Sequence, residues 1–199
     1  MINSAISHLA SQLNQFLKRS FDLNEDVVVV SNILEQDGSI SPNVNNKMVV
    51  ILTNIEKDTV PNRQPMNGPL AAGNGDFKRA GVTRPPLYLN LYLMFVANFG
   101  GGNYAEALKF ISKTIGFFQH QPVFDQSVTP DLDPRIEKLI LDIENLSIQD
   151  LSNLWGLLSG KYLPSILYKV RMVSFDTEDV VGQVPTIGDP QTQTAIARH

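Results

Sequence analysis

Few residues in this chain have a type and spacing suited to catalysis or metal binding. The sequence contains no cysteine, so neither a thiolate metal site nor a Cys–His nucleophile is possible. Its three histidines, His8, His120 and His199, stand far apart, and none falls in an HxxxH or HExxH frame. We therefore predict surface or partly buried histidines and no metal site.

Two glycine-rich stretches and one acidic stretch could serve a ligand. Residues 73–76 and 100–102 lack the frame of a phosphate-binding loop, which favours a flexible loop and a strand-to-helix break. Asp131, Asp133 and Glu137 alternate with prolines and lack the spacing of a calcium loop, which favours a solvated loop. No GxSxG elbow occurs. The sequence thus predicts no active site, no cofactor and a non-enzymatic protein.

Composition excludes several classes of protein. With 199 residues and 43% hydrophobic residues, the chain can build one medium domain with a sizeable core. A formal charge of −4 disfavours a dedicated nucleic-acid binder, which shows a basic surface. No stretch approaches the roughly 20 apolar residues of a membrane span. The absence of cysteine and of a basic signal region predicts a cytoplasmic origin.

Hydrophobic periodicity predicts the order of the elements. Apolar residues at three- and four-residue steps indicate a helix from residue 2 to about residue 19. β-Branched or alternating apolar runs indicate strands at 27–30, 47–56, 87–99 and 166–175. Two further helices are expected near 103–121 and 147–158, and 139–143 suits a strand, although a helix is also compatible with it.

These elements make a mixed α/β (α+β) fold in one domain, with a mixed or antiparallel sheet of about five or six strands flanked by about three helices. The domain is expected at 1–176, with a long loop at 60–86 that is rich in Pro, Gly and Asn. Residues 177–199 are polar and predict a flexible or partner-docked tail.

Some packing follows from spacing within these elements. The apolar odd positions of 87–95 predict a central strand. Ser147 and Asp150 are spaced like a helix capping box. For the second helix the expected buried face is Ala105, Leu108, Ile111, Ile115 and Phe118. The residues expected in the core near the last helix and strand are Trp155, Tyr162, Pro164 and Tyr168.

Charge is distributed unevenly along the chain, which points to interaction surfaces. Residues 60–86 contain four basic side chains, Arg63, Lys78, Arg79 and Arg84, and one acid, giving a local charge of +3. Residues 129–150 have a local charge of −4, and Asp131, Asp133 and Glu137 lie there. Opposite patches suit subunits that associate head to tail, and Phe77 is a candidate apolar anchor in the basic loop. From charge alone, two solvated loops remain an alternative.

Three stretches together carry a family resemblance. They are the opening helix 2–17, the strand and helix from Pro86 through Leu108, and Ile143 to Leu151 followed by Leu154-Trp155, Tyr162, Pro164-Ser165 and 168–171. Together they resemble the N-terminal domain of the tail-terminator, or tube-cap, proteins of extracellular contractile injection systems of the antifeeding-prophage type.

This resemblance implies a structural function. It implies a homo-hexameric ring that ends polymerisation of the inner tube and joins the tube to the sheath, with those two proteins as partners and no nucleic acid. It also implies assembly in the bacterial cytoplasm as part of a particle that can be released. The alternative from another class is a small-ligand or carbohydrate-binding adaptor module, for which Tyr88, Tyr92 and Tyr168 are the candidate pocket residues.

Overall fold

The computed structural model describes residues 1–35, 37–58, 80–83, 87–100, 102–158, 162–174 and 180–184. The chain divides into two compact units, one made of 1–59 and 86–175 and the other of 60–85 and 176–199. In the second unit, β3 (Ala80–Thr83) pairs antiparallel with β8 (Val180–Val184). The prediction of a domain at 1–176 with a separate tail stays a prediction.

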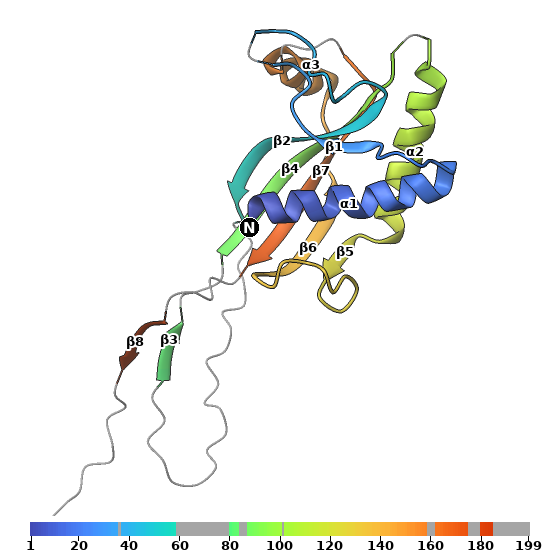
Figure 1. The fold of residues 1–199 in the computed structure, drawn as a ribbon. Coiled ribbons are helices and arrows are strands. Elements are labelled where there is room, and N and C mark those ends of the chain that lie inside the picture. The colour runs from blue at the N-terminus through green and yellow to red at the C-terminus, as the bar shows by residue number, and fades with distance from the viewer. Residues whose placement is uncertain are drawn as a thin grey trace, which may run out of the picture. The chain divides into compact units, whose positions relative to one another are not determined.

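The first unit is a curved sheet with helices on both faces (Figure 1). Its strands are β1 (Val28–Val30), β2 (Lys47–Lys57), β4 (Leu87–Asn98), β5 (Val123–Asp125), β6 (Ile136–Ile143) and β7 (Ser165–Ser174). The strand order is β1-β2-β4-β7-β6-β5, with β1 parallel to β2 and the other neighbours antiparallel. Its helices are α1 (Ile2–Phe21), α2 (Tyr104–His120) and α3 (Ile148–Leu157). The predicted mixed α/β fold is confirmed.

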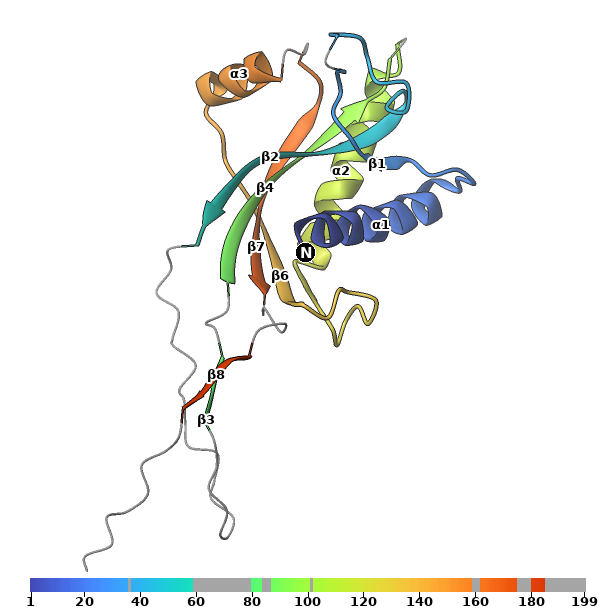
Figure 2. The same cartoon turned by 60° about the vertical axis from the view of Figure 1, so that its left-hand side comes forward.

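Strand β4 is buried on both faces, which makes it the centre of the sheet. Leu91, Leu93 and Phe95 point into the larger core, which lies under α1 and α2. Met94 and Val96 point the other way, into a smaller core under α3. Figure 2 shows α3 on the opposite side of the sheet from α1 and α2. Because side chains alternate along a strand, the apolar run predicted as a central strand needs cover on both sides.

Helix α1 buries one continuous stripe against this larger core. Leu9, Leu13 and Leu17 are fully buried, as the three- and four-residue spacing predicts. Further round the helix, Phe16 stacks on Phe117 of α2 with ring centroids 4.9 Å apart. Helices α1 and α2 are thus joined by aromatic contacts as well as by the shared sheet.

Helix α2 is rotated relative to the prediction. Its buried residues are Ala107, Phe110, Thr114 and Phe118. Ala105 and Leu108 are exposed, so the predicted face was wrong at these two positions. The reason is the size of the aromatic rings, since Phe118 packs 5.1 Å from the ring of Phe95 on β4 and Phe110 stacks 4.3 Å from that of Phe21 on α1. Filling these spaces with rings fixes which face of the helix meets the sheet.

Helix α3 is held on the outer face of the sheet by Trp155. This side chain is 4% exposed and belongs to the same core as Met94 and Leu167. The helix begins as predicted, because the backbone N–H of Asp150 donates to the Ser147 hydroxyl at 3.1 Å. The Ser147 hydroxyl in turn donates to the Asp150 carboxylate at 2.6 Å.

The structure decides between strand and helix at 139–143, and it contains three short strands that were not predicted from sequence. The run at 139–143 is a strand, β6, and begins earlier, at Ile136. The short strands β3, β5 and β8 were not anticipated from sequence. They have three to five residues each, which is too few for a periodic pattern to show. No helix among the described residues is long and apolar enough to cross a membrane.

Replacing Trp155 by alanine tests the packing of α3. We expect Trp155→Ala to lower the free energy of unfolding by about 3–5 kcal/mol, because it leaves a large cavity between α3 and the sheet. The control is Ile148→Ala on the same helix, where the side chain is 88% exposed and the expected change is within about 0.5 kcal/mol. Denaturant unfolding followed by circular dichroism measures both. Equal losses in the two variants would contradict the packing described here.

Candidate interaction surfaces

The basic residues predicted for an interface are not among those that the structure describes. Arg63, Phe77, Lys78, Arg79 and Arg84 all lie outside the described residues. Their role in an interface therefore stays a prediction from sequence. The acidic residues predicted with them, in contrast, can be placed.

Asp133 is engaged within its own loop. Its carboxylate accepts hydrogen bonds from Arg135 Nε at 3.0 Å and from Arg135 Nη2 at 2.8 Å. The backbone N–H of Arg135 donates to the same carboxylate at 3.0 Å. The Arg135 side chain, this N–H and the Ser4 hydroxyl hold the pKa of Asp133 well below its usual range. The charge of Asp133 is thus balanced inside the chain, which reduces what it can offer a partner.

Asp131 lies beside helix α1. Its Oδ2 atom is 3.8 Å from His8 Nδ1 and accepts a hydrogen bond from Gln12 at 3.5 Å. His8 is 8% exposed, and its ring meets that of Phe124 edge-on with centroids 6.1 Å apart. Burial lowers the pKa of His8 below its ordinary value of 6.5, and the nearby Asp131 offsets only part of this shift. His8 is therefore neutral at pH 7 and mainly a packing residue.

The acidic stretch of the sequence separates into two places in the fold. Asp131 and Asp133 lie in the loop before β6, and Glu137 is exposed on that strand. Glu144 and Asp150, at the other end of the stretch, lie beside α3. There they meet Glu56 from β2, which is distant in sequence. Sequence reasoning missed Glu56, because its position depends on the order and register of the strands.

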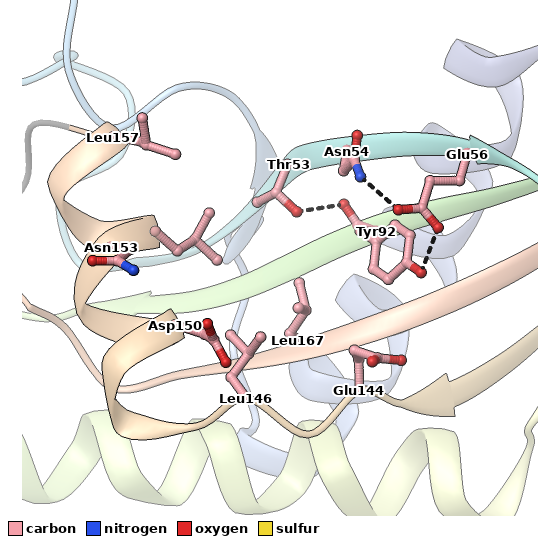
Figure 3. Close-up of a pocket in the computed structure, with 11 residues that line it drawn as sticks. Thr53, Asn54, Glu56, Tyr92, Glu144, Leu146, Asp150, Asn153, Leu157 and Leu167 are labelled. Carbon is pink, nitrogen blue, oxygen red and sulfur yellow. Dashed lines mark hydrogen bonds between the residues drawn. The ribbon is translucent and has the colours of Figure 1, made fainter.

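An open groove with a volume of about 370 Å³ lies between α3 and the outer face of the sheet (Figure 3). Its lining residues are Thr53, Asn54, Glu56, Tyr92, Glu144, Leu146, Asp150, Asn153, Leu154, Leu157 and Leu167. Three of them are carboxylates and none is basic. The groove thus joins an apolar wall to a negatively charged rim.

Hydrogen bonds fix the polar wall of this groove. The Tyr92 hydroxyl donates to Glu56 Oε2 at 2.9 Å, and the Asn54 amide donates to Glu56 Oε1 at 3.0 Å. Figure 3 shows both bonds, with Glu144 on the neighbouring part of the wall. Burial, the hydrogen bond to Glu56 and the charges of Glu56 and Glu144 raise the pKa of Tyr92 to about 12. The hydroxyl thus stays protonated and orients the Glu56 carboxylate.

Large apolar side chains are exposed around α3. Ile148 is 88% exposed and Leu157 is 82% exposed, at the two ends of the helix. Tyr162 is 60% exposed, so its predicted place in the core was wrong, although its ring centroid lies 5.9 Å from that of Trp155. Exposed isoleucine and leucine at the two ends of a helix that Trp155 anchors to the sheet suit a surface that meets another protein.

The tyrosines proposed for a ligand pocket do not converge. Tyr168 is 2% exposed and lies in the core under α1 and α2, between Phe95 and Phe118. Tyr92 faces the opposite side of the sheet, in the groove beside α3. The alternation of side chains along neighbouring strands separates them, so the small-ligand alternative gains no support. Among the described residues, no group of three or more His, Asp or Glu could hold a metal ion.

The buried histidine predicts a pH dependence. Because the pKa of His8 is lower in the folded chain than in the unfolded chain, the unfolded state binds more protons just below pH 6.5. We therefore expect the free energy of unfolding to fall as the pH drops below 6.5 and His8→Leu to reduce this slope. The control is Ser7→Leu at an exposed position of α1, which should keep the slope. Denaturant midpoints measured at several pH values below 6.5 give the slope of stability against pH. An unchanged slope in His8→Leu would refute the attribution of this slope to His8.

Comparison with known proteins agrees with the fold. The sequence matches the family described as the Pvc16 N-terminal domain over residues 5–188. The structure is similar to that of the PVC sheath/tube terminator of an extracellular contractile injection system in its extended state, with 16% sequence identity and a TM-score of 0.60. It is also similar to the tube-terminating cap of the anti-feeding prophage, with 10% identity and a TM-score of 0.57.

These likenesses cover 98% and 97% of this chain but only 64% and 60% of the two solved chains, so this chain spans less than two thirds of their length. No curated protein matches the sequence. The family match nevertheless extends over most of the chain, including both compact units. The chain therefore belongs to the Pvc16 N-terminal domain family, in agreement with the resemblance to tail terminators that the three sequence stretches carry.

Proposed function

We propose that this chain is a structural cap, a tail terminator that ends the inner tube and sheath of a contractile injection system and joins the two. The observation that carries this proposal is the likeness of fold over nearly the whole chain to a sheath/tube terminator and to a tube-terminating cap. The family match supports it independently of the structure comparison. At sequence identities of 16% and 10%, the likeness is one of fold, and we infer the shared function from that fold.

The role is a binding role without catalysis. An open groove with carboxylates on its rim, hydrogen-bonded by tyrosine and asparagine, offers a docking surface and no nucleophile activated by a neighbouring base. A cap acts by presenting a surface complementary to the last ring of the tube on one side only. Its partners are then the inner-tube and sheath proteins of the same particle, with assembly in the bacterial cytoplasm and no nucleic acid.

Copies of the chain associate side by side in a homo-hexameric ring. A closed ring needs two different surfaces on each subunit, and complementary charge selects the correct pairing. The basic surface is supplied by Arg63, Lys78, Arg79 and Arg84, with Phe77 as the apolar anchor. The acidic surface comes from the 129–150 stretch, to which Asp131, Asp133 and Glu137 belong. Since Asp133 is already paired with Arg135, the more exposed acids contribute most.

Charge reversal in the basic segment tests this ring. We expect Arg79→Glu together with Arg84→Glu to weaken association between copies about tenfold, because two attractive contacts become repulsive. The matched control is Lys109→Glu with Lys113→Glu on the exposed side of α2, which changes the net charge equally. Light scattering over a range of concentration and salt gives the mass of each variant. The wild-type ring should weaken with added salt, since exposed charges are screened.

Capping itself is tested with tubes assembled from the inner-tube protein of the particle. The chain should sediment with tubes in an amount proportional to the number of tube ends and not to tube length. A chain that stays monomeric at high concentration and also fails to bind tube ends would overturn the proposed function.

A further inference from the structure

The groove beside α3 has the chemistry of a docking site for a positively charged, partly apolar segment. Three acids line it: Glu56 from β2, Glu144 directly after β6, and Asp150 in the first turn of α3. Leu154 and Leu157 form the helix side of the same groove. No lysine or arginine is among its lining residues. An occupant must therefore bring cations for the rim and an apolar side chain for the wall.

The three carboxylates of the groove differ in the hydrogen bonds that they already accept. Asp150 accepts a hydrogen bond from the Ser147 hydroxyl, and Glu56 accepts bonds from Asn54 and Tyr92. Those bonds come from neutral groups and leave the negative charges in place. Glu144 makes no ion pair with any described residue. The rim therefore keeps three negative charges that no cation in the lining offsets.

One cation does face this region from a neighbouring strand. Lys169 of β7 places its Nζ atom 6.0 Å from the centre of the Tyr92 ring. It is also in register with Asp142 of β6, a fourth acid on this side. Arg171, two residues further along β7, is paired with Asp58 at 3.1 Å. Together these groups give five acids and two cations, so the surface remains acidic.

The apolar wall is open to solvent at the end of α3. Leu157 is 82% exposed, and its side chain borders the groove (Figure 3). An exposed leucine at the edge of a groove can pack against an aromatic side chain that a partner inserts there. The wall and the acidic rim lie on two sides of one groove, so one short segment can reach both.

We propose that this groove binds the basic segment 77–84 of a second copy of the chain. That segment contains Phe77, Lys78, Arg79 and Arg84 and no acid, so it offers one aromatic anchor and three cations within eight residues. The match of charge and anchor to the groove is the reason to choose this occupant. The inference deepens the proposed function, because it rests on copies associating and names the acceptor surface for the basic segment.

Single cysteines test the contact directly, since the chain has none of its own. Asn153→Cys places a thiol in the groove, and Ala80→Cys places one in the basic segment. The two variants are mixed and treated with a short thiol cross-linker. We expect a covalent dimer that joins one copy of each variant. The control replaces Asn153→Cys by Glu25→Cys, at an exposed acid in the loop after α1, and should give at least tenfold less of that dimer.

Charge exchange adds a second readout. Glu144→Lys in the groove variant should lower the yield of cross-linked dimer about tenfold, and Arg79→Glu in the other variant should restore part of it. Glu25→Lys should leave the yield unchanged. Cross-linking to Glu137→Cys, at an exposed acid of the 129–150 stretch, in place of Asn153→Cys would overturn the groove as acceptor while leaving the ring intact. Cross-linking within single copies of the Asn153→Cys, Ala80→Cys double variant, with none between copies, would overturn the choice of a second copy.

A synthetic peptide of residues 74–86 separates failure of this inference from failure of the proposed function. The peptide should bind the full chain, lose about tenfold in affinity with Glu144→Lys, and keep its affinity with Glu25→Lys. A monomeric chain that binds the peptide in this way would contradict the ring and support the groove. An associating chain whose affinity for the peptide does not respond to Glu144→Lys would overturn the groove and leave the ring.

Discussion

The burial of β4 on both faces is the constraint on which the rest of the structure depends. Helices α1 and α2 cover one face, whereas α3 and the segment between β1 and β2 cover part of the other. Ten helical residues span about 15 Å, but the twelve residues of β4 span about 40 Å. The outer face is therefore dry under α3, around Met94, and polar beyond it, around Tyr92. The groove lies at this boundary because the helix ends before the strand does.

This boundary also explains where charge is available to a partner. The loop before β6 pairs Asp133 with Arg135 and sets Asp131 beside His8, so its acids mainly stabilise the chain itself. At the groove, the carboxylates are held by neutral donors and keep their charge. A protein that acts through its exterior needs charges that are fixed in position but not neutralised. The groove provides them, and rigid strands and a capped helix position them.

Much of the fold could be predicted from sequence, because its signals are local. Alternating leucines between Leu87 and Phe95 indicate the central strand, and Ser147 with Asp150 indicates the start of α3. The rotation of α2 could not be predicted, since it depends on which aromatic rings fit between α1 and β4. The groove could not be predicted either, because Glu56 meets Glu144 only through the order and register of the strands. The basic segment 77–84 can be recognised from the sequence. The groove that we propose as its binding surface can be recognised only in the folded structure.

The most direct test of the account is cryo-electron microscopy of inner tubes mixed with this chain. We expect a closed ring of identical copies on one end of each tube, with neighbouring copies in contact through oppositely charged surfaces. Bare tube ends, with the chain present only as separate molecules, would contradict the claim that this protein acts by assembling with itself on a tube.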